Sequence, residues 1–256
     1  MPIFSMLAFV ARIPMRVLVA EHEPMWLEFL CPRLQLREMQ PVRVVTGEKA
    51  WSVLEEKDAP RLAIIDRRIP SLDAMEICRR LRRRGDPFYT YVVLLLPNAH
   101  RTEELLALEA GADDCLPKPF GEEELMARLE IAERVLDVDK RLTKITSQWR
   151  QMLDALPFGV AAVDGNGILR RMNRTFARQM GYSSIHALLG QSLTYLFQSK
   201  LDLHGFLQEV RMIEPFDNVE VRCRGGKGLA PAVRVWGRPL PENDEAVYEI
   251  IVQELR

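Results

Sequence analysis

Four polar residues follow apolar runs in the first half of the sequence, and together they have the side chains needed to phosphorylate a carboxylate. Glu21 and His22 follow the first run, Asp66 follows the third and Lys118 follows the fifth. In such a set the aspartate is the nucleophile, acidic neighbours hold Mg²⁺, and the lysine neutralises phosphoryl oxygens. This chemistry requires separate strands to bring the four residues to one place.

Five apolar runs alternate with amphipathic segments from Met15 to about residue 134. The runs are continuously apolar, as in strands buried on both faces of a parallel sheet. The predicted strands include residues 17–20, 42–45, 62–65, 92–96 and 115–116, and the predicted helices about 24–39, 47–57, 73–84, 101–110 and 121–134. Five such repeats predict a doubly wound α/β domain, whose ligands bind at the carboxyl ends of the strands. Pro32 should kink or shorten the first helix.

Three segments of this half resemble response-regulator receiver domains of two-component systems, a flavodoxin-like fold with a five-stranded parallel sheet. The segments are Val-Leu-Val-Ala-Glu21-His22-Glu-Pro, Ile-Ile-Asp66-Arg-Arg-Ile-Pro-Ser-Leu-Asp and Leu-Glu-Ala-Gly-Ala-Asp-Asp-Cys-Leu-Pro-Lys118-Pro119-Phe. The resemblance covers residues 15–134. It implies that Asp66 is the phosphoacceptor, that Lys118 binds the phosphoryl group, and that Pro119 follows a cis peptide bond. It also implies a Mg²⁺ site at Glu21, Asp66 and the position of His22.

Three positions depart from the receiver pattern. His22 stands where the family has a second acid, and Leu96 ends the fourth strand where the family has Thr or Ser. Cys115 occupies a position associated with switch aromatics. Imidazole is a poor Mg²⁺ ligand and leucine cannot bind a phosphoryl oxygen, so we expect weak metal binding. Two interpretations stay open: a slow phospho-switch, or a pseudo-receiver that keeps the fold as an interaction surface.

Apolar residues repeat with a 4-3-4-3 spacing beyond the α/β domain, typical of a coiled coil. These residues form an apolar seam, which predicts a helix at residues 131–156 that associates with a second copy of the chain. This interpretation is favoured over the alternative, a helix that lies on one domain of its own chain. Pro157 should end the helix. The seam consists of Ile131, Val135, Val138, Leu142, Ile145, Trp149, Met152 and Leu156.

The second half resembles PAS domains from residue 152 to about 255. The resemblance rests on a strand–turn–strand segment around Asp164-Gly-Asn-Gly, on Asn173-Arg-Thr-Phe, and on Gly181-Tyr-Ser. Asn173 should cap a helix that Gly181 ends, helical turns should extend to about residue 213, and three strands should close an antiparallel α+β domain. The ligand is unknown. Flavin-photoreceptor PAS domains need a reactive cysteine on the central helix, whereas Cys223 is predicted to lie on a strand. Haem would need an axial ligand such as His204, but a lone histidine on such a helix is more often a surface residue.

Composition bounds the class and partners of the protein. A net charge of −1 argues against general binding to nucleic acid or membrane, and the arginines of residues 79–84 are expected to be a solvated helix end. Four widely spaced cysteines suit the reducing cytoplasm. Residues 1–14 are expected to be a disordered leader or the product of a mis-called start codon, not a signal peptide.

These observations predict a dimeric signalling protein of three parts: a receiver domain (15–134), a coiled-coil helix (131–156) and a PAS domain (157–256). It would not be an enzyme. Its partners would be a histidine kinase or phosphotransfer protein and a second copy of itself, and its output would run through protein contacts. Two alternatives stay open, a small-molecule or redox PAS sensor with an inert receiver, and the regulatory part of a larger kinase or cyclase system.

Overall fold

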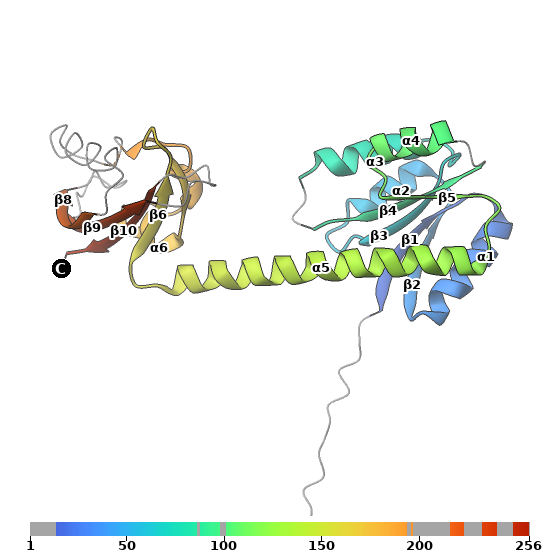
Figure 1. Cartoon of the computed structure of the whole chain (residues 1–256), viewed down its shortest axis with the longest axis horizontal. Helices are drawn as coiled ribbons and strands as arrows, with labels where there is room; N and C mark the ends of the chain where they lie inside the picture. Colours follow the sequence, from blue (N-terminus) through green and yellow to red (C-terminus); the bar gives the residue numbers. More distant parts are fainter. Residues whose placement is uncertain are drawn as a thin grey trace, which may run out of the picture. The chain divides into compact units, whose positions relative to one another are not determined.

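The structure of the chain is a computed structural model, which describes residues 14–85, 88–97, 101–193, 196, 216–222, 232–239 and 248–255. The leader expected at residues 1–14 lies outside this range, except for its last residue. The chain divides into two compact units, with the boundary between residues 144 and 145. Figure 1 shows both units.

The first unit is built on a parallel five-stranded sheet with strand order β2-β1-β3-β4-β5. This order confirms the predicted doubly wound fold. The strands are β1 Met15–Ala20, β2 Met39–Val44, β3 Leu62–Asp66, β4 Tyr91–Leu96 and β5 Asp114–Pro117. The helices are α1 Pro24–Leu36, α2 Gly47–Leu54, α3 Ala74–Arg83, α4 Arg101–Glu109 and α5 Glu122–Ala155.

Helices cover both faces of this sheet, and the strands are continuously apolar for that reason. Leu18 and Ile65 pack with α2, α3 and α4, whereas their neighbours Val19 and Ile64 pack with α1 and the first part of α5. Figure 1 shows the two helical layers on opposite sides of the strands. Successive residues of each strand therefore enter opposite halves of the core.

The segment between α1 and β2 differs from its prediction. The helix ends at Leu36, three residues before its predicted end at about residue 39 and four residues beyond Pro32. Strand β2 begins at Met39, three residues earlier than predicted. Glu38 adopts a left-handed conformation with φ of 59°, which reverses the chain after the helix. Met39 then pairs with Met15 of β1. The first residues of β2 lack a strand-like pattern of their own and belong to the strand because they pair with β1.

Helix α5 is continuous across the boundary between the units, as its sequence pattern predicts, and ends at Ala155. Leu125, Leu129, Ala132 and Leu136 are buried in the core of the first unit. Within the described ranges, no helix combines the length and the apolar character needed to cross a membrane.

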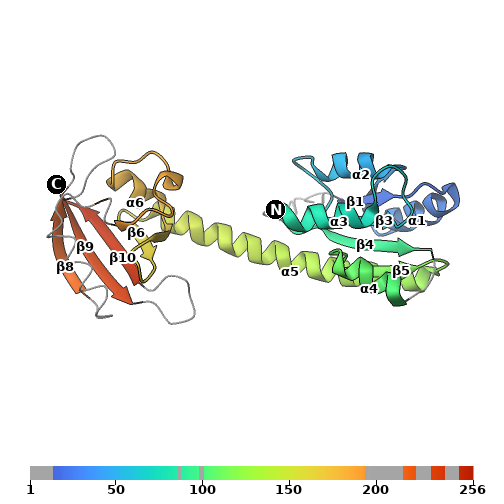
Figure 2. The same cartoon turned by 90° about the horizontal axis from the view of Figure 1, so that it is seen from above.

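The second unit is an antiparallel sheet with strand order β7-β6-β10-β9-β8, and Figure 2 shows its last three strands side by side. Its elements are β6 Gly159–Val163, β7 Leu169–Met172, α6 Arg174–Gln179, the 3-10 turn η1 Ile185–Ala187, β8 Phe216–Arg222, β9 Ala232–Pro239 and β10 Tyr248–Glu254. Among the residues described for this unit, Phe176 of α6 and Tyr248 of β10 are the largest fully buried side chains of the core.

Two local predictions for this unit are confirmed. The Asn173 side chain accepts a hydrogen bond from the N–H of Phe176 and so caps α6, and Gly181 follows the helix with φ of 78°. Most of the helical turns expected up to residue 213 fall outside the described residues, as do His204 and Cys223.

Candidate functional site

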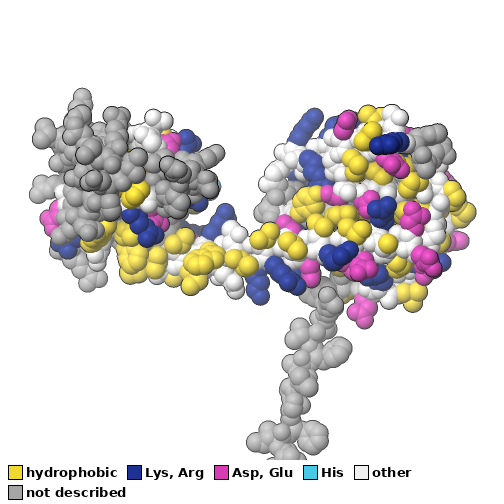
Figure 3. Space-filling model, in the orientation of Figure 1, with side chains coloured by type: hydrophobic (Ala, Val, Ile, Leu, Met, Phe, Trp, Pro, Cys, Tyr) yellow, Lys and Arg dark blue, Asp and Glu magenta, His cyan; other side chains and the backbone are white. Residues whose placement is uncertain are grey.

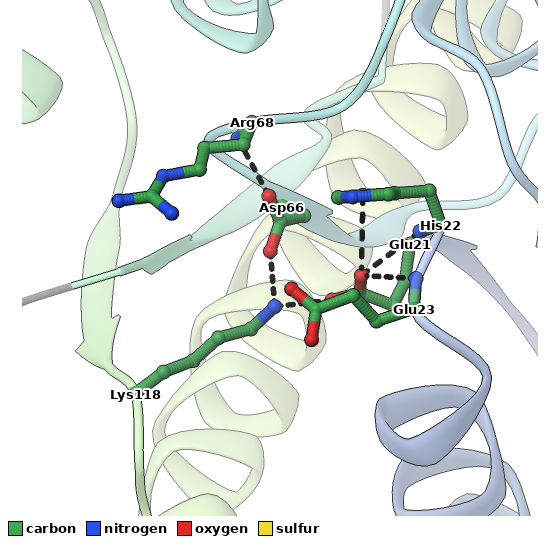
Figure 4. Close-up of polar contacts among 6 residues, drawn as sticks. All are labelled: Glu21, His22, Glu23, Asp66, Arg68 and Lys118. Atoms are coloured by element: carbon green, nitrogen blue, oxygen red, sulfur yellow. Dashed lines mark hydrogen bonds and ion pairs between the residues drawn. The ribbon is translucent and has the colours of Figure 1, made fainter.

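Three charged side chains meet at the carboxyl edge of the parallel sheet. Glu21 follows β1, Asp66 is the last residue of β3, and Lys118 follows β5. The Lys118 ammonium group donates to Glu21 Oε2 at 2.6 Å and also to Asp66 Oδ2 (Figure 4). The structure thus brings together the central residues singled out from the sequence, with the lysine between the two carboxylates.

Backbone N–H groups bind the remaining carboxylate oxygens. The amides of His22 and Glu23 both donate to Glu21 Oε1 at 2.9 Å, and the amide of Arg68 donates to Asp66 Oδ1 at 2.5 Å. All four oxygens of Glu21 and Asp66 therefore accept a hydrogen bond, which fixes the orientation of both carboxylates.

The three central groups are withdrawn from solvent. Glu21 is fully buried, Asp66 is 3% exposed, and the Lys118 side chain is 8% exposed. Burial raises the pKa of the Glu21 carboxyl above its usual value, against the lowering effect of the Lys118 hydrogen bond. The Lys118 ammonium also lies 5.1 Å from the centre of the Trp26 ring, where a cation is attracted to the π face. The sequence analysis did not identify Trp26, which shows no signal beyond an aromatic residue in α1.

The peptide bond between Lys118 and Pro119 is cis, as the resemblance implied. Two further residues stand at the predicted switch positions. Leu96 is fully buried at the end of β4 and offers no hydroxyl group. Cys115 is 8% exposed, and burial raises the pKa of its thiol to about 11. Both side chains are packed in the core shared with α2, α3 and α4.

The two arginines after Asp66 do not bind its carboxylate with their side chains. Arg67 pairs with Asp73 at 2.6 Å, and the Arg68 guanidinium points away from the Asp66 oxygens in Figure 4. The contribution of Arg68 to the carboxylate comes from its backbone.

The arginine-rich end of α3 is engaged within the first unit. Arg79 and Arg80 pair with Glu76, and Arg82 pairs with Asp113 at 2.6 Å. Arg84 donates to the carbonyl oxygen of Leu54. These contacts tie four of the five arginines of the run to the first unit, at the end of α3 where the sequence predicted a solvated helix end.

Glu21, His22 and Asp66 offer ligand atoms that all lie within 4.8 Å of one another. The acidic cluster expected of a metal site is therefore present. The donor set does not fit Mg²⁺, however, because this ion prefers oxygen ligands and the third donor here is an imidazole. The Lys118 ammonium moreover already neutralises one oxygen of each carboxylate.

The predicted seam is largely exposed on α5. Trp149 and Met152 are 62% and 63% exposed, and Val135, Val138, Leu142 and Ile145 are also exposed. Ile131 packs partly against the core of the first unit, and Leu156 is half-buried. Figure 3 shows hydrophobic side chains gathered along α5.

A profile of the response regulator receiver domain matches residues 17–130, and a profile of the PAS fold matches residues 147–250. Response regulator MprA of Mycolicibacterium vanbaalenii is 34% identical over 117 residues, which cover 46% of this chain and 49% of that protein. The chain spans about half the length of the curated relatives it matches.

Two solved structures each match about half of this chain. The BeF3-activated N-terminal receiver domain of RstA from Klebsiella pneumoniae is 27% identical, with a TM-score of 0.42, and the match covers 46% of this chain and 97% of that one. The PAS domain of an HTR-like protein from Haloarcula marismortui is 19% identical, with a TM-score of 0.41, and covers 46% of this chain and 98% of that one. By its two family profiles, this chain contains a response regulator receiver domain at residues 17–130, followed by a PAS domain at residues 147–250.

Proposed function

We propose that the protein is a phosphorelay component in which Asp66 accepts a phosphoryl group and the rest of the chain relays that state by protein contacts, with no enzymatic output of its own. The observation that carries the proposal is the buried bond from Lys118 Nζ to Asp66 Oδ2. A single nucleophilic carboxylate, held beside a fixed positive charge at a sheet edge, suits transfer to an oxyanion.

The donor we propose is a phosphohistidine on a histidine kinase or phosphotransfer protein. Asp66 Oδ2 forms a bond to phosphorus while the bond from phosphorus to the imidazole nitrogen breaks. The leaving imidazole keeps that electron pair and later takes a proton from solvent. Lys118 exchanges its contact with Oδ2 for contacts with phosphoryl oxygens, and so neutralises their charge.

The test is phosphorylation of the full chain with acetyl phosphate or a purified kinase. We expect one acid-stable, base-labile acyl phosphate, and we expect Asp66→Asn to abolish it. Asp58→Asn is the matched control, since Asp58 lies outside the pocket and pairs with Arg16. Labelling that persists in Asp66→Asn would contradict the assignment of Asp66.

We further propose that the protein acts as a parallel homodimer joined through the seam of α5. Support comes from the exposure of Val138, Ile145, Trp149 and Met152 along one stripe of the helix. Burying a large apolar side chain contributes roughly 1.5–3 kcal/mol, so several such pairs can offset the entropy lost on association. A parallel pair also places each receiver and each PAS domain beside its counterpart.

The pocket also supports a second candidate function, a receiver that is never phosphorylated. Leu96 and Cys115 are buried at the two switch positions, where they supply neither the hydroxyl nor the aromatic group through which a phosphoryl state would be sensed. In that case the Lys118 bridge is structural and sensing falls to the PAS domain. A kinase that binds the chain without labelling it would favour this function, and an absorbance spectrum would reveal a PAS-bound haem or flavin.

The free, buried thiols of Cys31, Cys78 and Cys115 support a site of action in the reducing cytoplasm.

A further inference from the structure

We propose that Trp26 is a positioning residue for Lys118: its indole ring holds the ammonium group beside Asp66 without neutralising the positive charge. The use of this contact in phosphoryl transfer rests on the proposed function. The contact itself is measured without any phosphodonor, so that the two proposals can fail separately.

The Lys118 ammonium group has a third side beyond its two carboxylate contacts. It carries three N–H donors, and within the described part of the chain the hydrogen-bond acceptors of Nζ are Glu21 and Asp66. Nζ also lies over the Trp26 ring, 5.1 Å from its centre. A cation within about 6 Å of an indole face is attracted by the ring quadrupole, more strongly where water is excluded. The Lys118 side chain is 8% exposed, so the attraction acts in a nearly dry site.

The Trp26 ring is itself held by two phenylalanines. It stacks on Phe120, with ring centres 4.6 Å apart and planes at 28°, and it meets Phe29 edge-on at 5.7 Å. Phe29 and Phe120 also meet edge-on, at 5.8 Å. These are favoured geometries for aromatic pairs. Because Trp26 and Phe120 are both buried, the indole has little freedom to turn away from Lys118.

One short segment contacts Trp26 with two side chains. Phe120 stacks on the ring, and Lys118, two residues earlier, lies over it. Trp26 belongs to α1, which begins three residues after Glu21. The ring therefore connects the segment that carries the lysine to the helix next to the carboxylate that the lysine binds.

A neutral ring suits this position better than a third carboxylate would. In the proposed transfer, Lys118 gives up its contact with Asp66 Oδ2 and binds phosphoryl oxygens. A further carboxylate would neutralise the ammonium group and compete with those oxygens. The ring attracts a cation but leaves its net charge unchanged. Lys118 can therefore stay in the pocket, fully charged, while its partner changes.

A double-mutant cycle in the full chain tests the contact. Trp26→Leu keeps an apolar side chain but removes the π face, and Lys118→Met removes the cation. We expect Trp26→Leu to be less destabilising in the Lys118→Met background than in the wild type. The expected difference is at least about fivefold in the equilibrium constant for unfolding of the receiver domain, which corresponds to about 1 kcal/mol. Urea denaturation followed by amide NMR signals of the first unit measures it.

A second measurement needs no variant of the lysine. The order parameter of the Lys118 side chain, from NMR relaxation, should fall in Trp26→Leu and fall less in Trp26→Phe, which keeps a π face. Trp51→Leu is the matched control, because Trp51 packs against the other half of the core and its effect should add to that of Lys118→Met. Additive effects of Trp26→Leu and Lys118→Met, or an unchanged order parameter in Trp26→Leu, would overturn the contact.

Labelling with acetyl phosphate then tests the use of the contact. We expect Trp26→Leu to lower the maximal labelling rate about fivefold and to leave the half-saturating concentration of acetyl phosphate unchanged, because only the lysine is misplaced. Trp26→Phe should recover part of the rate. An unchanged rate in Trp26→Leu would overturn the positioning role. A wild type that is never labelled would contradict the proposed function instead, and the double-mutant cycle would still decide the contact with Lys118.

Discussion

The side-chain amide of Asn173 donates a hydrogen bond to the carbonyl oxygen of Leu153, 2.7 Å away, in the last turn of α5. The same amide donates to the carbonyl oxygen of Phe158, and its oxygen accepts from the N–H groups of Val160 and Phe176. One buried residue thus connects the end of the long helix, the first strand of the PAS sheet and the start of α6. Any movement of the end of α5 must strain this set of bonds.

We expect Asn173→Ala to lower the free energy of unfolding of the PAS domain by about 2–3 kcal/mol, because it removes a helix cap and leaves buried backbone groups unsatisfied. Urea denaturation followed by the signals of the second unit measures the change. Asn166→Ala, in the exposed turn between β6 and β7, is the control and should cost little. Equal stability of the two variants would show that the Asn173 bonds do not hold the junction.

Lys118→Met should destabilise the receiver domain most strongly at neutral and higher pH. Without Lys118, two buried carboxylates face each other without compensation, a loss of up to about 3–5 kcal/mol. The pKa of Glu21 is already raised above its usual 4.5, so its contribution to stability is present below that value and is lost as pH rises through the raised pKa. Losing the lysine should raise this pKa further.

The measurement is denaturation of the wild type and Lys118→Met between pH 5 and 8, reported as their difference in stability. We expect the difference to grow with pH. Lys57→Met, at an exposed lysine, should show no such trend. A difference that is flat across this range would contradict the coupling between Lys118 and the buried carboxylates.

Ile145→Glu combined with Met152→Glu should convert a dimer into a folded monomer, because both residues are exposed on the seam and charge there opposes burial. Sedimentation at tens of micromolar, a rough working concentration for an interface of modest strength, measures the change. Lys140→Gln with Gln151→Glu makes the same change in net charge at exposed α5 positions away from the seam and should leave the dimer intact. A wild type that is already monomeric would refute the dimer.

The turn between β6 and β7 should lose stability in acid through Asp164. Burial alone would raise the pKa of this carboxyl. Its pKa is instead lowered by hydrogen bonds from the N–H groups of Ile168 and Asn166 and by two hydrogen bonds from the Arg170 guanidinium. A lowered pKa contributes stability that is present above the unfolded value of about 3.8 and is lost as pH falls through the folded pKa.

Asp164→Asn should therefore destabilise the PAS domain at pH 7 by more than it does near pH 3. Thermal unfolding of the variant and the wild type across this range tests the sign. A destabilisation that is equally large at pH 7 and near pH 3 would mean that the charge of the Asp164 carboxylate contributes no stability.

The local pattern of the chain determined much of the fold and of the candidate site. Continuous apolar runs identified the buried parallel strands, and parallel strands present their carboxyl ends at one edge, so Glu21, Asp66 and Lys118 had to converge. The cap at Asn173 and the left-handed Gly181 also depend on local conformation alone. Each of these features is set by residues close in sequence or by the period of one element.

Tertiary structure decided the features that depend on partners distant in sequence. The position of Lys118 between two carboxylates, the pairing of Arg67 with Asp73, and the reach of Asn173 to the end of α5 all depend on how elements pack. The start of β2 at Met39 likewise follows from pairing with β1, and no apolar pattern in the sequence predicts it. Periodicity in the sequence specifies which face of an element is apolar. What that element contacts is specified only by packing, which brings backbone and charged groups within hydrogen-bonding distance.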